Sequence, residues 1–132
     1  MAPKINSLDH LVLTVANIEK TLEFYVEVFG MRKVSFRHVD GTNRHALCFG
    51  NQKFNLHKAG EEFEPKADKP TTGAIDLCLL TNDSLETWTE HLGHCGVQIE
   101  IGPIDRTGAQ GPLRSIYIRD PDANLIEISN QK

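Results

Sequence analysis

The sequence has no long apolar run and no apolar leader, and both absences narrow the class of protein. No stretch of its 132 residues approaches the ~18 apolar residues that a membrane-spanning helix needs. The first ten residues, MAPKINSLDH, lack the apolar core of a secretory signal and run straight into an expected core strand. We therefore expect a cytoplasmic protein that has no membrane partner.

Cysteine is scarce as well, and its spacing excludes two kinds of site. Cys48, Cys78 and Cys95 are odd in number and form no CxxC pair. A disulfide framework uses cysteines in even numbers, and a zinc ribbon uses close pairs. We expect each of the three to be a buried free thiol.

The chain has neither a basic stripe nor a linker near its middle. Its 14 Lys and Arg residues against 18 Asp and Glu give a formal net charge of −4, and the basic residues are scattered. Such a sequence offers no electrostatic footprint for nucleic acid, so we expect no nucleic-acid partner. Without a Pro- or Ser-rich break, a single domain over 1–132 is expected.

The first half of the sequence predicts the element order βαβββ. Alternating apolar residues at 8–15 indicate a strand, after which Asn17 offers a helix N-cap. Apolar residues then recur at three- and four-residue spacing over 18–29, and Gly30 suits a left-handed C-terminal cap. Three further strands are expected at 33–39, 44–49 and 53–58.

The second half repeats this order after a loop at 59–72. A strand is expected at 74–81, Ser84 offers the N-cap of a helix over 85–95, and Gly96 follows that helix. The remaining strands are expected at 97–101, 113–119 and 124–129. The segment 102–112 contains three glycines and suits a lid or a plain flexible loop. The chain is thus expected to hold two modules, at about 7–58 and about 74–129.

The two modules align as an internal repeat. A shift of 66 positions places Asp76 on His10 and Gly96 on Gly30, since 76 − 10 and 96 − 30 agree. Near the end of each module the shift grows to 72, which makes Asn55 the counterpart of Glu127.

Strand alternation predicts that three ionisable side chains share one face. Leu11, Leu13 and Val15 can pack on the helix, which turns His10 to the opposite face. The same alternation in the second module turns Asp76 and Glu127 away from their apolar neighbours.

Carboxylates within apolar strands need compensation, because desolvating a charge costs several kcal/mol. A divalent cation held by His10, Asp76 and Glu127 would provide it, and these ligand types suit Mn, Ni, Fe, Mg or Zn without selecting one. Two alternatives stay open: a hydrogen-bonded trio with a charged imidazole, and a solvent-filled groove in which neither acid is desolvated.

Three segments, LDHLVLTV, FYVEVFGM and IYIRDPDANLIEIS, lie at the first expected strand, at the end of the first expected helix and at the end of the second module. They resemble the vicinal oxygen chelate superfamily, which includes glyoxalase I, fosfomycin-resistance transferases, extradiol dioxygenases and bleomycin-binding proteins. The resemblance covers nearly the whole chain. The segments ALCFGNQKFNLHKAGEEFEPKA, GPLRSIYIRDPD and NLIEISN look like the glyoxalase-domain-containing protein 5 group and bacterial lactoylglutathione lyase-like proteins.

The resemblance implies an α+β fold in which two βαβββ modules form an eight-stranded, cup-shaped, incompletely closed mixed sheet with the helices outside. It also implies metal ligands at His10, Asp76 and Glu127, and a homodimer. The position at which glyoxalase I carries a fourth ligand, a glutamate, is Asn55 here, so the resemblance does not extend to that ligand.

The function implied is a metal-dependent lyase or isomerase that acts on a small oxygen-rich or glutathione-linked substrate. Glu127 or Asp76 would move the proton. Further candidate pocket residues are Asn55, His57, Arg44 and Arg114. The alternative is a metal-independent module that binds a small molecule, as the bleomycin-binding relatives do.

Overall fold

The computed structural model describes all residues, 1–132, and they divide into two compact units, Met1–Pro70 and Thr71–Lys132. Each unit contains one helix and one four-stranded sheet in the order βαβββ. The predicted α+β class and the two βαβββ modules are confirmed. Neither sheet closes on itself, and the expectation of a single domain over 1–132 stays a prediction.

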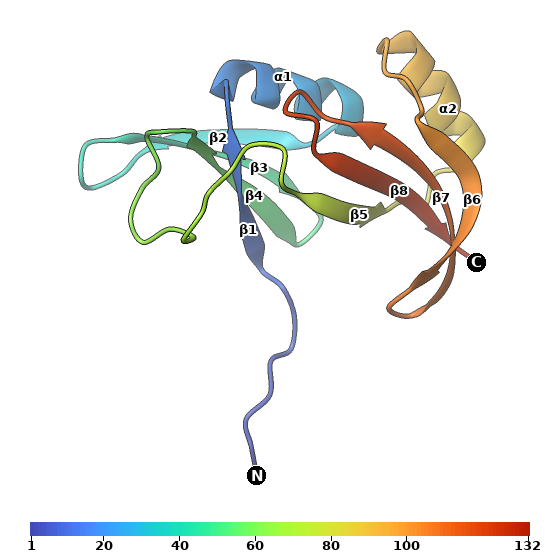
Figure 1. Cartoon of the computed structure of the whole chain (residues 1–132), viewed down its shortest axis with the longest axis horizontal. Coiled ribbons are helices and arrows are strands. Elements are labelled where there is room, and N and C mark those ends of the chain that lie inside the picture. Colours follow the sequence, from blue (N-terminus) through green and yellow to red (C-terminus); the bar gives the residue numbers. More distant parts are fainter. The chain divides into compact units, whose positions relative to one another are not determined.

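The sheet of the first unit has the strand order β1-β4-β3-β2, with α1 lying over one of its faces (Figure 1). Strand β1 pairs with β4 in parallel, and the other pairings are antiparallel. The elements are β1 (His10–Val15), α1 (Ile18–Phe29), β2 (Arg32–Arg37), β3 (Asn43–Phe49) and β4 (Gln52–Lys58).

Both predicted caps of α1 are confirmed. The side chain of Asn17 accepts a hydrogen bond from the backbone N–H of Lys20, which satisfies a donor that the helix leaves free. At the other end Gly30 adopts a left-handed conformation with φ of 66°. Leu22, Tyr25 and Val28 are buried and form the apolar face of the helix; the sheet residues of this core are Leu13, Val15, Leu47, Phe54 and Leu56.

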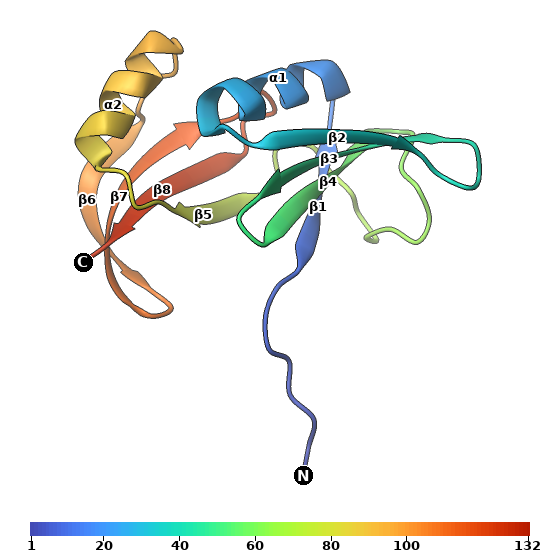
Figure 2. The ribbon, with the colours of Figure 1, turned by 180° about the vertical axis from the view of Figure 1, so that it is seen from behind.

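The second unit repeats this arrangement in its own sheet, with the order β5-β8-β7-β6. Figure 2 shows α2 beside this sheet from the side opposite to that in Figure 1. The elements are β5 (Asp76–Leu80), α2 (Leu85–His94), β6 (Ile101–Gly108), β7 (Gly111–Arg119) and β8 (Leu125–Gln131). Leu85 and Leu92 are buried on α2; the buried sheet residues are Ile116, Ile118, Ile126 and Ile128.

Strand β6 corrects the sequence prediction. We expected a strand at 97–101 and an irregular loop at 102–112, but the strand occupies Ile101–Gly108 and pairs with β7. Gly102 has φ of 107°, and the register shifts between Ile101 and Ile104, so the glycine permits an irregularity inside the strand. The turn signals therefore mark a bulge and a short hairpin turn, not a lid.

Helix α2 is one residue shorter than the expected 85–95. It ends at His94, Cys95 caps it in a right-handed conformation, and the expected glycine, Gly96, follows with φ of 71°. The predicted N-cap is confirmed, because the Ser84 hydroxyl accepts a hydrogen bond from the Thr87 backbone N–H.

Strand pairing places the repeat in register. In the first unit Val12 of β1 is opposite Asn55 of β4, and in the second Cys78 of β5 is opposite Glu127 of β8. Since 78 − 12 is 66 and 127 − 55 is 72, these are the shifts that the sequence predicts. Asn55 and Glu127 thus occupy equivalent positions in their own sheets.

None of the helices is long and apolar enough to cross a membrane.

Candidate functional site

Glu127 lies on the face of the second sheet that is turned away from the isoleucine core. It is opposite Tyr117 of β7 and Cys78 of β5, and side chains opposite one another in a sheet point to the same side. Ile126 and Ile128 flank it in sequence and are buried on the other face. The alternation predicted for this strand is therefore confirmed.

Buried hydroxyls hold one oxygen of the Glu127 carboxylate. The Ser115 hydroxyl donates to Oε2 at 2.6 Å, and the Ser129 hydroxyl lies 3.3 Å from the same oxygen. Both serines are fully buried and lie 2.6 Å from each other, and the Cys78 thiol is 3.2 Å from Ser129. This network orients Glu127 and leaves Oε1 available to a ligand.

A pocket of about 530 Å³ opens on this face of the second unit. Its polar lining includes Glu127, Arg106 and Cys78; the other lining residues are Leu80, Thr107, Gly108, Ala109, Gln110, Leu113 and Gln131. Cys78 is exposed as a residue, but partial desolvation of its thiol raises the thiol pKa; the hydrogen bond between Cys78 and Ser129 lowers this pKa, and the nearby Glu127 charge raises it. A small molecule can therefore approach both a carboxylate and a guanidinium here.

Arg106 of β6 was missed as a site residue because the sequence prediction placed it in a loop. Its Nε donates to the Tyr117 hydroxyl at 2.9 Å, and its guanidinium carbon lies 5.5 Å from the centre of that ring. Once β6 is drawn as a strand, alternation places Arg106 opposite Leu113 and on the pocket face.

Asp76 is the first residue of β5 and is opposite Leu125 of β8. Leu125 and Glu127 are two residues apart in β8, so Asp76 lies on the same face of the sheet as Glu127. It does not line the 530 Å³ pocket and forms no ion pair within 4 Å. The nearby Arg119 guanidinium is bound instead by both oxygens of Glu100, each at 3.1 Å. The hydrogen bonds to Glu100 are the main cause of the raised pKa of Arg119, and the negative charge of Asp76 raises this pKa further.

The turn after β7 fixes the start of β5. Asp120 is buried and accepts three hydrogen bonds of 2.9 Å, from the backbone of Asp122 and from the backbone and side chain of Asn124. Asn124 in turn accepts the backbone N–H of Ile75 at 2.9 Å, next to Asp76. The side chains of this turn therefore have a structural role.

His10 belongs to the first unit and is the first residue of β1. Its Nδ1 is 2.8 Å from a carboxylate oxygen of Asp9, and 45% of its side chain is exposed. The parallel register places it on the same face as Asn55 and His57. The hydrogen bond to Nδ1 leaves Nε2 as the ring nitrogen that can bind a ligand.

Arg44, His57 and Phe63 form a second cluster on that face. The Arg44 guanidinium carbon lies 3.7 Å from the centre of the Phe63 ring, and its Nη2 is 2.9 Å from Asp40. The His57 ring meets Phe63 edge-on at 5.2 Å between centres. Burial lowers the pKa of His57 and the Arg44 charge lowers it further, against a smaller opposing effect of Glu62.

Arg114 lies apart from the pocket. It is opposite Asn130, which puts it on the face opposite to Glu127, and its nearest carboxylate is that of Asp105 at 3.9 Å. Half of its side chain is exposed.

The three cysteines are free, as expected, but the expectation that they are buried is wrong. Cys78 is exposed and the other two, Cys48 and Cys95, are half-buried. Cys78 shares the polar face of its strand with Asp76, which is why apolar surroundings do not enclose it.

The structure contains no group of three or more His, Cys, Asp and Glu side chains that could hold a metal ion. Within the second unit, however, Asp76 and Glu127 lie on one face, and neither is paired with a cation. Two unpaired carboxylates are a donor set that suits a divalent cation completed by a further ligand.

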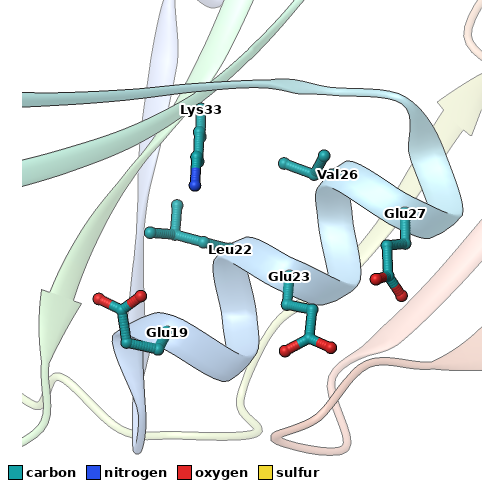
Figure 3. Close-up of a pocket in the computed structure, with 6 residues that line it drawn as sticks. All are labelled: Glu19, Leu22, Glu23, Val26, Glu27 and Lys33. Carbon is teal, nitrogen blue, oxygen red and sulfur yellow. The ribbon is translucent and has the colours of Figure 1, made fainter.

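A separate groove of about 340 Å³ lies between α1 and β2 and is drawn in Figure 3. Lys33 extends from β2 toward Leu22, whereas the carboxylates of Glu23 and Glu27 point away from Lys33 (Figure 3). The groove contains none of the predicted site residues.

Comparison with known proteins identifies the family. The model of the Glyoxalase/Bleomycin resistance protein/Dioxygenase superfamily matches residues 7–128. The chain is 51% identical over 125 residues to virulence protein STM3117 of Salmonella typhimurium, covering 95% of this chain and 84% of that protein. It is also 51% identical over 126 residues to glyoxalase domain-containing protein RDO1 of Mycosarcoma maydis, covering 96% of this chain and 69% of that protein.

A solved structure agrees with these matches. The integron cassette protein VCH_CASS1 from the mobile metagenome of V. cholerae is 52% identical, with a TM-score of 0.93 and coverage of 100% of both chains. The chain therefore belongs to the Glyoxalase/Bleomycin resistance protein/Dioxygenase superfamily.

Proposed function

We propose that this chain is a metal-dependent lyase or isomerase of the superfamily that acts on a small oxygen-rich or glutathione-linked substrate. The observation that carries the proposal is the Glu127 carboxylate, which faces a 530 Å³ pocket with one oxygen held by Ser115 and the other available. An oriented carboxylate in a pocket is the group that a proton-transfer reaction requires.

We propose His10, Asp76 and Glu127 as the residues that hold a divalent ion, whether Ni, Mn, Fe, Zn or Mg. Two of them are carboxylates on one face of the second sheet without a cationic partner, and the third is an imidazole whose Nε2 is available. When bound, such an ion polarises a substrate carbonyl and stabilises the negative charge that forms on its oxygen.

The side chains of this chain would perform the remaining steps. Glu127, or Asp76 beside it, would take a proton from one carbon of the substrate and return it to the adjacent carbon. The Ser115 hydroxyl would keep the Glu127 carboxylate in one orientation during both transfers. Asn55, His57 and Arg44 share the polar face of the first sheet and are proposed to contact substrate, and Arg114 is retained as a candidate from the sequence.

The alternative is a metal-independent module that binds a small molecule on the same fold. Asn55 favours it, because an uncharged amide stands at the position equivalent to Glu127 and reduces the charge available to a metal. The proposed cytoplasmic location, the homodimer and the likeness to the glyoxalase-domain-containing protein 5 group apply equally to both functions.

The test is metal affinity. Metal content is first measured on protein purified without chelator, and Mn²⁺, Ni²⁺ and Zn²⁺ are then titrated into metal-free protein by calorimetry. We expect His10→Ala, Asp76→Asn and Glu127→Gln each to weaken binding by at least about tenfold, as loss of a metal-supporting residue does. His94→Ala, an exposed histidine on α2, is the matched control and should bind as the wild type does.

Equal affinity in the wild type and all three site variants would contradict the metal site. A metal-free wild type whose small-molecule binding survives His10→Ala and Glu127→Ala would favour the binding module instead.

A further inference from the structure

The pocket of the second unit contains two opposite charges that do not pair with each other. Glu127 and Arg106 both line it, yet no nitrogen of Arg106 is within 4 Å of any carboxylate. Arg44 is paired with Asp40 and Arg119 with Glu100; Arg32 and Arg37 have no carboxylate within 4 Å either, but they do not line this pocket. A guanidinium that faces a pocket without an anion beside it is a group left for a ligand.

Tyr117 holds Arg106 in place without neutralising it. Tyr117 is 9% exposed, its hydroxyl accepts the Nε–H of Arg106 at 2.9 Å, and a tyrosine hydroxyl carries no charge at neutral pH. One terminal nitrogen of Arg106 is 3.4 Å from the backbone carbonyl of Asp105, and the other has no partner. The hydrogen bond to Tyr117 therefore orients the guanidinium, and the positive charge of Arg106 is not neutralised by a protein group.

The same tyrosine also fixes the position of Arg106 relative to the proposed reacting group. Tyr117 is directly opposite Glu127 across β7 and β8, so one ring connects the anchored arginine with the oriented carboxylate. A ligand that reaches both groups needs an anionic end to bind Arg106. Its other end, which meets Glu127, needs an oxygen and must be uncharged unless a metal ion lies between the two.

We propose that Arg106 recognises the carboxylate of a small organic acid that binds in this pocket, with the reacting end directed to Glu127. This inference rests on the proposed function for the orientation of the ligand, but the recognition of the anion by Arg106 does not require a metal. A carboxylate matches the planar guanidinium with two oxygens, which makes the contact specific as well as attractive.

The experiment is a titration of the full ¹⁵N-labelled chain in buffer freed of metal with a chelating resin. The probes are lactate and glycolate, their neutral amides lactamide and glycolamide, and inorganic phosphate. Chemical shifts of the amides of Gly108, Leu113 and Gln131, which line the pocket, report binding there. We expect both acids to shift them saturably and each amide to bind at least about tenfold more weakly, since a charge-assisted contact is lost.

Variants separate recognition of the anion from general effects. Arg106→Gln should weaken binding of the acids by about tenfold while the affinity for the amides stays the same. Arg32→Gln removes an exposed arginine of β2 that does not line this pocket and should bind all probes as the wild type does. Circular dichroism of Arg106→Gln should match the wild type, because this side chain is exposed.

Three results would overturn the inference: no saturable shift with either acid, equal affinity for acids and amides, or acid binding that survives Arg106→Gln. Binding of phosphate alone would also overturn it in favour of a phosphate-type ligand. Failure of the metal titrations with Arg106-dependent acid binding intact would refute the proposed metal chemistry and leave this inference standing.

Discussion

Replacing Asp120 by alanine should destabilise the second unit strongly, because this residue holds the turn that fixes the start of β5. Asp120 is 6% exposed, and its carboxylate accepts hydrogen bonds from both the backbone N–H and the side-chain amide of Asn124. Asn124 is 1% exposed, so both donors would stay buried without a partner. An unsatisfied buried donor costs about 1–3 kcal/mol, which gives a loss of about 3 kcal/mol for the pair.

The assay is urea unfolding followed by circular dichroism, and the control is Asp68→Ala, an exposed aspartate in the loop between β4 and β5. Asp120→Asn can keep an acceptor for the backbone donors and should lose roughly half as much as the alanine variant. A loss below about 1 kcal/mol for Asp120→Ala, close to that of an ordinary surface substitution, would refute the reasoning.

Three further predictions concern single residues. Gly73→Ala should cost at least about 1 kcal/mol more than Gly60→Ala in urea unfolding: both glycines have positive φ, but a Cβ at Gly73 would lie 2.7 Å from the Asp122 carbonyl oxygen and one at Gly60 would meet open space. Equal losses would contradict the predicted clash. Because burial lowers the pKa of His57 below its ordinary 6.5, the unfolded chain binds more protons there. Stability should therefore fall as the pH falls below about 7, and His57→Gln should flatten that slope in thermal unfolding curves; an unchanged slope would argue against it. Burial raises the pKa of the Cys78 thiol, so its alkylation by iodoacetamide, followed by mass spectrometry, should be slower at pH 7 than that of free cysteine and should rise beyond pH 9. Alkylation as fast as that of free cysteine would refute this.

Local signals were sufficient to predict most of the fold. The caps at Asn17, Gly30 and Ser84 were predictable because a capping side chain and a left-handed glycine act within a few residues of the helix end. The internal repeat supported the prediction of two equivalent modules. Its shifts of 66 and 72 residues agree with the equivalent strand pairings in the two sheets.

Strand β6 was not predictable by the same means. Its sequence, IGPIDRTG, holds two glycines, a proline and two charged residues, and such a composition indicates a loop when it is considered alone. Pairing with β7 supplies the hydrogen bonds that make it a strand, and this contact is not local. The same cause concealed Arg106, whose side of the hairpin is defined only once the pairing is known.

The polar face was predictable only in part. Alternation correctly turned Glu127 and Asp76 from the apolar side, but the hydroxyls that orient Glu127 come from β7 and β8 together. Ser115 and Ser129 are two small polar residues within apolar strands, a signal that could have suggested a buried hydrogen-bond partner.

The central claim, that Asp76, Glu127 and His10 bind a divalent ion, is tested most directly by paramagnetic broadening. Mn²⁺ is added in substoichiometric amounts to the ¹⁵N-labelled chain, and the loss of each amide signal is measured. We predict that the signals of these three residues disappear first, and that Glu127→Gln abolishes the effect. Broadening centred instead on Glu19, Glu23 and Glu27 of the α1 groove, or unchanged by Glu127→Gln, would contradict the claim.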